Sequence, residues 1–250
     1  MSQRAWVEQV MGLPVSIHLR GPRTRDADVE EVVAAAYAEL RAVDRLFSTW
    51  RRDSQVSQLR RGERRLGSCD PLVREVADLC EEARARTYGA FSAWLPDGAG
   101  ETRFDPTGLV KGWAADRAAA VLQRAEGHAY CLNAGGDVVV GGRDAGDTPA
   151  AAADGGRCWR IGIEDPRDRS RITEVVELSR GAVATSGTAA RGQHLIDPVT
   201  GQAVTGDGSV SVVGSTLMWA DVWATALFVG PSGLAGRLAT EQPGYRLVRL

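Results

Sequence analysis

Lysine is almost absent from this chain of 250 residues: among its 30 lysine and arginine side chains, only Lys111 is a lysine. A compact ammonium suits sites where a planar guanidinium does not fit. Lys111 is therefore a candidate for a site that requires an ammonium. The alternative is that this lysine has been retained by chance.

The chain also lacks a strong charge of either sign and any apolar run of membrane length. Its net charge is −2 and its pI is about 6.0, so it has no basic field to attract nucleic acid, and we expect no nucleic-acid partner. The opening stretch MSQRAWVEQVMGLPVSIHLRG holds no apolar signal region and no cysteine for lipid attachment. We therefore expect no membrane anchor in this chain and a cytoplasmic location.

Cysteines are few and widely spaced. The four are Cys69, Cys80, Cys131 and Cys158, and no two form a C-x-x-C pair. This spacing indicates neither a zinc site nor a disulfide framework. We expect free, buried thiols.

What the chain does contain is enough apolar sequence for one large domain spanning residues 1–250, since 44% of its residues are hydrophobic. Alternation predicts a strand pair over 6–21 that bends near Gly12 and Pro14, and later strands over 130–142, 158–165, 174–187 and 208–215. Helical periodicity predicts helices over 25–48, 71–87, 110–127 and 218–230. The segment 141–157, rich in Gly, Ala and Asp, is predicted to be a surface loop. The irregular order favours an α+β fold, with a mixed or antiparallel sheet and flanking helices.

The segment FDPTGLVKGWA places Asp105 just before a turn that contains Gly108, and Lys111 in the first turn of a helix. Free backbone N–H groups at a helix start and an ammonium favour a bound phosphate, and a glycine lets the backbone approach a ligand closely. The alternative is that Asp105 is a turn residue and Lys111 a solvated charge.

Two further segments could bind ligands. Two glycines of NAGGD, residues 133–137, interrupt a predicted strand, which indicates either a bulge or a close approach by a ligand. Asp221 and Thr225 are four residues apart, so their oxygens share one helix face and could hold Mg²⁺. Alternatively, Asp221 is a first-turn partner of the helix dipole and Thr225 bonds back to a carbonyl.

Three histidines are present, and we expect His18 and His128 to be incidental. His194 lies between a Ser-Gly turn and Asp197-Pro198, where it could act as an acid or base. Asp197 would then orient the histidine or fix the loop.

Taken in order, several stretches resemble the FAD:protein FMN transferase family, the ApbE-type proteins formerly described as thiamine-biosynthesis lipoproteins. The matching stretches are MGLPVSI, VDRLFSTWRRDSQVSQL, FDPTGLVKGWAADRA, LNAGGDVVVGG, ATSG, HLIDPVTG and ADVWATAL. The resemblance implies a single ApbE-like domain that uses Mg²⁺ and FAD. It also implies transfer of FMN to a Thr or Ser hydroxyl of a target protein, with release of AMP.

The resemblance implies a role for each matching residue. The metal ligands would be the Gly108 carbonyl, Asp221 and Thr225, and His194 would be the base or would position the target hydroxyl. The flavin contacts would be Met11, Trp50, Ala90, Phe91, Ser92, Asp105, Lys111 and Ile196.

This chain departs from the family pattern at two positions of the site. Ser92 stands where the family usually has an aspartate, and Ala224 stands where some members have a second aspartate. A metal-dependent FAD pyrophosphatase and a non-catalytic FAD-binding protein are the alternative functions. Asp221 and Thr225 argue against the second, because flavin storage needs no metal site.

Overall fold

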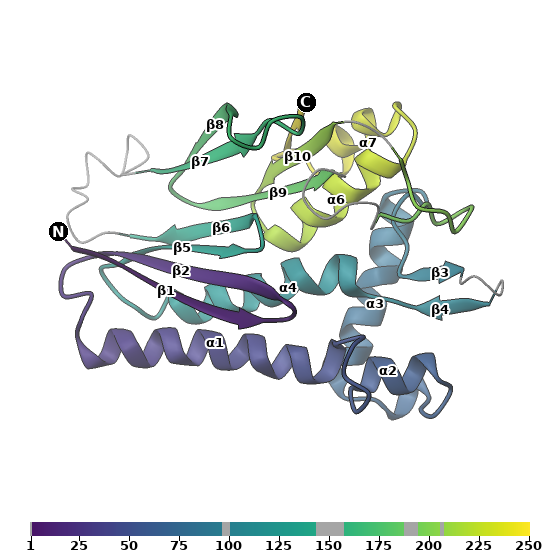
Figure 1. Ribbon diagram of the computed structural model, residues 1–250, viewed down its shortest axis with the longest axis horizontal. Coiled ribbons are helices and arrows are strands. Elements are labelled where there is room, and N and C mark those ends of the chain that lie inside the picture. Colours follow the sequence, from purple (N-terminus) through teal and green to yellow (C-terminus); the bar gives the residue numbers. More distant parts are fainter. Residues whose placement is uncertain (1, 97–100, 144–157, 188–194, 206–207) are drawn as a thin grey trace.

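The computed structural model describes residues 2–96, 101–143, 158–187, 195–205 and 208–250 (Figure 1). Its main sheet has seven strands in the spatial order β1-β2-β5-β6-β9-β10-β11, and every neighbouring pair is antiparallel. These strands are Ser2–Val10 (β1), Leu13–Gly21 (β2), Ala129–Ala134 (β5), Asp137–Gly142 (β6), Gly181–Gly187 (β9), Ser209–Gly214 (β10) and Arg246–Arg249 (β11). The expected α+β fold with an antiparallel sheet is confirmed.

The helices are Ala27–Phe47 (α1), Gln55–Arg60 (α2), Pro71–Arg86 (α3), Thr107–Leu122 (α4), Leu217–Val229 (α6) and Leu234–Glu241 (α7). A short 3-10 helix covers Leu66–Ser68. Two separate hairpins pair Trp94–Pro96 (β3) with Thr102–Phe104 (β4), and Trp159–Glu164 (β7) with Ile172–Leu178 (β8).

The helices α1, α4 and α6 form the main core with one face of the sheet, and the β7–β8 hairpin covers part of the other face (Figure 1). On that second face, Ile163 and Val176 of the hairpin pack on Val183, Val213 and Val248 of the sheet. Within the main core, α4 packs against α1, α6 and the strands β5 and β6. Its apolar residues are spread around the whole helix, as expected of a helix buried on nearly all sides.

Two hairpin turns bring residues to one end of the sheet. The β1–β2 turn consists of Met11 and Gly12, with φ values of 56° and 73°, and the β5–β6 turn consists of Gly135 and Gly136, with φ values of 64° and 107°. Two successive positive φ values are typical of the tight turns that match strand twist. The interpretation of NAGGD as a bulge within one strand was wrong, because its glycines form a turn between two strands.

The close approach of α4 to α6 depends on two residues of α4 that lie four apart. A Cβ at Gly112 would lie 2.7 Å from the Cα of Met218, so only glycine fits there without displacing α6. The carboxylate of Asp116 accepts hydrogen bonds of 2.9 Å from the backbone N–H groups of Leu217 and Met218. Asp116 therefore caps the start of α6, whose first N–H groups have no partner within the helix.

Several predicted boundaries need correction. The predicted helix 110–127 begins three residues earlier, at Thr107, and ends at Leu122. The predicted strand 174–187 is two strands, β8 and β9. The sequence analysis missed α2, α7, the β3–β4 hairpin and β11, which are all too short to show a clear period.

The other general expectations have mixed outcomes. Cys69, Cys80, Cys131 and Cys158 are free as expected, but only the first two are fully buried. Within the described ranges, no helix is long and apolar enough to cross a membrane. Of the predicted loop 141–157, Gly141 and Gly142 belong to β6, and residues 144–157 lie outside the described residues.

Candidate active site

A cavity of about 910 Å³ lies where the β1–β2 and β5–β6 turns meet the start of α4, the β7–β8 turn and α6. Every described residue to which the sequence analysis assigned a metal or flavin contact lines this cavity. These residues are Met11, Trp50, Ala90, Phe91, Ser92, Asp105, Gly108, Lys111, Ile196, Asp221 and Thr225. His194, the predicted catalytic residue, lies outside the described residues.

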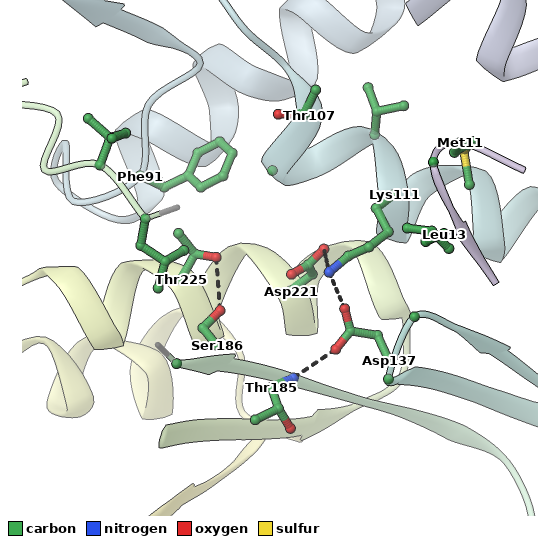
Figure 2. Close-up of a pocket in the computed structure, with 18 of the residues that line it drawn as sticks. Met11, Leu13, Phe91, Thr107, Lys111, Asp137, Thr185, Ser186, Asp221 and Thr225 are labelled. Carbon is green, nitrogen blue, oxygen red and sulfur yellow. Dashed lines mark hydrogen bonds and ion pairs between the residues drawn. The ribbon is translucent and has the colours of Figure 1, made fainter. Parts of the chain in front are cut away.

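Lys111 lies between two carboxylates (Figure 2). Its Nζ is 3.3 Å from Oδ2 of Asp221 and forms a second ion pair with Asp137. Lys111 is the fifth residue of α4, so its predicted place in the first helical turn was wrong. The alternative of a solvated charge is also wrong, because only 17% of the lysine side chain is exposed.

Asp137 is a residue of the site that the sequence analysis missed. It follows the β5–β6 turn directly, and its Oδ1 accepts a hydrogen bond of 2.9 Å from the backbone N–H of Thr185 on β9 (Figure 2). Neighbouring strands thus fix one carboxylate oxygen and leave the other for Lys111. The glycine pair before Asp137 was the available signal, but periodicity does not reveal which helix faces a turn.

The two predicted ligands on α6 both face the cavity. Asp221 is buried, with 3% of its surface exposed, and it is the fifth residue of the helix, so the first-turn alternative was wrong. The Thr225 hydroxyl lies 3.0 Å from the Ser186 hydroxyl at the end of β9 (Figure 2). Ser186 was not assigned a role, although it belongs to the quoted ATSG stretch.

The donor set around α6 suits a hard divalent cation. Carboxylate, hydroxyl and backbone carbonyl oxygens are the ligands that Mg²⁺ takes, and Asp221, Thr225 and Gly108 would supply one of each. In the described part of the chain, no three or more His, Cys, Asp and Glu side chains form a metal-binding group. The proposed metal ligands therefore include only one carboxylate, that of Asp221, and carry little negative charge. One ammonium and two carboxylates leave a net negative charge, so a pyrophosphate would bind more favourably with a divalent cation present.

Asp105, at the cavity edge before α4, has two sets of partners. Its Oδ2 is 2.6 Å from Nη1 of Arg60, and its Oδ1 accepts hydrogen bonds from the Thr107 backbone N–H and hydroxyl. These contacts to Thr107 agree with the alternative that Asp105 is a turn residue. Arg60, the last residue of α2, was missed, because nothing in the arginine-rich sequence around it distinguishes it.

The walls of the cavity are partly apolar. Phe91 is buried and packs against Gly108, where an added Cβ would lie 3.3 Å from its ring. Trp50, in contrast, is 93% exposed although it lines the cavity. The Ser92 hydroxyl bonds the backbone N–H and C=O of Trp94, so it stabilises the turn.

The segment that carries Ile196 is folded on itself. Asp197 accepts a hydrogen bond of 2.8 Å from the Val199 backbone N–H, and Ile196 forms an antiparallel bridge with Ala203. Of the two roles considered for Asp197, orienting His194 or fixing the loop, these contacts agree with the second. The other two histidines do not line the cavity: His18 lies beside Ser16 on β2, and the buried ring of His128 bonds the Pro22 carbonyl.

The β7–β8 turn forms a wall that the sequence did not predict. Glu164, Asp165 and Arg169 line the cavity there, and Nε of Arg169 lies 2.8 Å from Oε2 of Glu164. The charge of this turn faces the cavity only because the hairpin folds back over the sheet.

The sequence assigns the chain with this fold and cavity to a known protein family. The sequence pattern of the ApbE family matches residues 11–97 and 94–248, and the chain belongs to this family. It is 26% identical to the FAD:protein FMN transferase of Klebsiella pneumoniae, over 87% of this chain and 76% of that protein. It is 31% identical to the Vibrio cholerae protein of the same name, over 60% of this chain and 46% of that protein.

Solved structures agree on the fold. The ApbE protein of Thermotoga maritima superposes with a TM-score of 0.79 at 21% identity, covering 99% of this chain and 94% of that one. The flavinyl transferase ApbE of Pseudomonas stutzeri in its apo form superposes with a TM-score of 0.74 at 23% identity, covering 99% and 95% of the two chains.

Proposed function

We propose that this chain transfers FMN from FAD to a Thr or Ser hydroxyl of a target protein and releases AMP. The observation that carries the proposal is that one cavity gathers all eleven described residues expected to contact flavin or metal. Membership of the ApbE family, and relatives named FAD:protein FMN transferase, support the same activity.

The reaction exchanges the phosphoanhydride bond of FAD for a phosphate ester on the acceptor. The acceptor oxygen forms a bond to the FMN phosphorus, and the bond from that phosphorus to the AMP oxygen breaks. The hydroxyl proton passes to a base, and the AMP phosphate leaves with the bonding electron pair. Catalysis then depends on positioning and on neutralising phosphate charge.

The residues of the cavity divide these tasks. Lys111 would place its ammonium beside the pyrophosphate, with Asp137 and Asp221 fixing its position. Asp221, Thr225 and the Gly108 carbonyl would hold Mg²⁺. A bound Mg²⁺ supplies a Lewis acid that neutralises phosphate charge. Met11, Trp50 and Phe91 would contact the flavin nucleotide, together with Ala90, Ser92, Asp105 and Ile196.

The proposal is tested by incubating the protein with FAD, Mg²⁺ and a candidate acceptor domain, followed by intact-mass analysis. Transfer adds the mass of an FMN group to the acceptor, and an acceptor whose Thr or Ser is changed to Ala stays unmodified. Free FMN and AMP alone would instead identify a pyrophosphatase. Unchanged FAD would identify a binding protein.

We also propose that His194 is the base or positions the acceptor hydroxyl. His194→Ala is then expected to slow transfer about 10²- to 10⁴-fold at saturating FAD, the usual contribution of a positioned acid or base. FAD affinity should change little. Weakened FAD binding with normal turnover at saturation would instead make His194 part of the binding site.

A further inference from the structure

The strand β1 forms one edge of the seven-stranded sheet. Within the part of the chain that the structure describes, its nine residues pair with β2 on one side and with no strand on the other (Figure 1). An edge of this length presents backbone N–H and C=O groups that can accept another strand. Four of its side chains are exposed on the face away from α1, including Val7 at 65%.

The sequence of β1, SQRAWVEQV, is complementary to itself when the strand is reversed about its midpoint, Trp6. In an antiparallel pair centred on Trp6, Arg4 lies opposite the partner's Glu8, and Ala5 lies opposite the partner's Val7. Gln3 then lies opposite the partner's Gln9, and the two copies of Trp6 meet at the axis. Opposite charges and aromatic side chains that lie directly across two strands stabilise the pairing.

Other registers lose this match. In a two-fold symmetric antiparallel pair of strands, residues directly opposite each other share a face of the sheet. The register can therefore shift only in steps that move the residue opposite Arg4 by two positions. One slip places Arg4 opposite the partner's Trp6, and the reverse slip places it opposite the partner's Val10. Only the register centred on Trp6 pairs all nine residues, and it is also the register that pairs the opposite charges.

The charged side chains of β1 are already held in place by α1. Arg4 forms an ion pair with Glu30, which also accepts a hydrogen bond of 3.0 Å from Nε1 of Trp6. Glu8 lies 2.5 Å from Nη1 of Arg41. Because these contacts order the side chains before association, less rotamer entropy is lost when a partner binds.

The helix face next to β1 leaves room for a second copy. Glu30, Ala34, Ala38 and Arg41 follow at intervals of four, four and three residues, so they lie on one side of α1. Glu30 and Arg41 contact β1, and Ala34 and Ala38 between them are exposed. The small alanine side chains allow another helix to approach closely.

We propose that β1 pairs antiparallel with β1 of a second copy of this chain, in the register centred on Trp6, and joins the two sheets. The β1–β2 turn, which carries Met11 to the cavity, lies at one end of β1. Antiparallel pairing therefore places the two cavities at opposite ends of the shared edge. Both can take substrate independently, so this inference does not depend on the proposed function.

The test is the molar mass of the full chain in solution, measured by sedimentation velocity and light scattering. At about 100 µM, where an interface with a micromolar Kd is almost fully formed, the wild-type chain should be a dimer. Arg4→Glu and Glu8→Arg should each give monomers, because like charges then lie opposite each other. The double variant should recover the dimer, although it opposes the charges of Glu30 and Arg41 within each chain.

A matched control exchanges another exposed ion pair on a strand. Arg160 and Glu177 pair across the β7–β8 hairpin, so Arg160→Glu with Glu177→Arg should leave the mass unchanged. The register is tested by mixing Ala5→Cys and Val7→Cys chains. The mixture should form a disulfide-linked heterodimer more readily than either variant by itself forms a disulfide-linked homodimer. A monomeric wild type at this concentration, or a dimer that both single reversals leave intact, would overturn the proposal.

Discussion

The carboxylate of Asp116, on α4, accepts a hydrogen bond of 2.9 Å from the backbone N–H of Leu217, the first residue of α6. The same helix α4 carries Lys111, and α6 carries Asp221 and Thr225. The cap and the close contact at Gly112 therefore fix how these two helices meet, and with them the distance between the ammonium of Lys111 and the carboxylate of Asp221.

Asp116→Ala is expected to destabilise the protein, because it leaves two N–H groups at a buried helix start without their acceptor. Each such group costs about 1–3 kcal/mol. Asp116→Asn should be milder, since its amide oxygen can still accept one of the two bonds. Urea unfolding measures both changes, and equal stability of all three proteins would contradict the capping role.

The parts of the site that could be predicted from the sequence are the local ones. Asp221 and Thr225 share a helix face because they lie four residues apart, and the β1–β2 turn follows from Gly12 between two alternating segments. The partners Asp137 and Arg60 depend on which elements become neighbours in space. Sequence periodicity gives the buried face of each element but not its neighbour, so these two were missed.

Lys111→Ala should leave Asp137 and Asp221 close together without their cation. Removing one member of a buried ion pair costs about 3–5 kcal/mol, so the melting temperature should fall. Mg²⁺ should raise that temperature more in Lys111→Ala than in the wild type, because it replaces the missing positive charge. Thermal scans with and without Mg²⁺ measure this difference.

FAD binding gives a second measure of Lys111. Lys111→Ala should weaken FAD affinity, and Lys111→Arg should not restore it fully, because a guanidinium is larger and planar. Flavin fluorescence titrations of the three proteins test this. Equal affinities would show that the ammonium does not contact the dinucleotide.

Asp221→Ala should abolish Mg²⁺-dependent turnover and leave the fold intact, since it removes the carboxylate of the proposed ligand set. Thr225→Val should have a smaller effect, because it removes a neutral hydroxyl. Turnover as a function of Mg²⁺ concentration and circular dichroism measure both properties. If Asp221→Ala kept its Mg²⁺ dependence, the metal would have to bind elsewhere in the cavity.

Trp50→Ala should weaken FAD binding about 2- to 10-fold, the equivalent of ~0.5–1.5 kcal/mol from one stacked aromatic contact. Its unfolding free energy should change by less than about 0.5 kcal/mol, because a side chain that is 93% exposed contributes little to folding. The quenching of tryptophan fluorescence by FAD should also decrease. Unchanged affinity and quenching would place the flavin nucleotide away from this loop.

Cys80 should resist alkylation in the folded protein. Burial raises the pKa of its thiol from 9.0 to about 12, with smaller contributions from Glu81 and Asp105. Only about one thiol in 10⁴ is then a thiolate at pH 8, and the thiolate is the nucleophile.

The same shift sets the sign of a pH effect on stability. The folded protein keeps the Cys80 proton between pH 9 and 12, whereas the unfolded chain loses it. This thiol's contribution to stability therefore falls as the pH rises through that window.

The alkylation of Cys80 is measured with iodoacetamide at pH 8 followed by peptide mass mapping, with the chain in guanidinium chloride as the control. Modification of Cys80 at similar rates in the two states would show that α3 opens readily at this position.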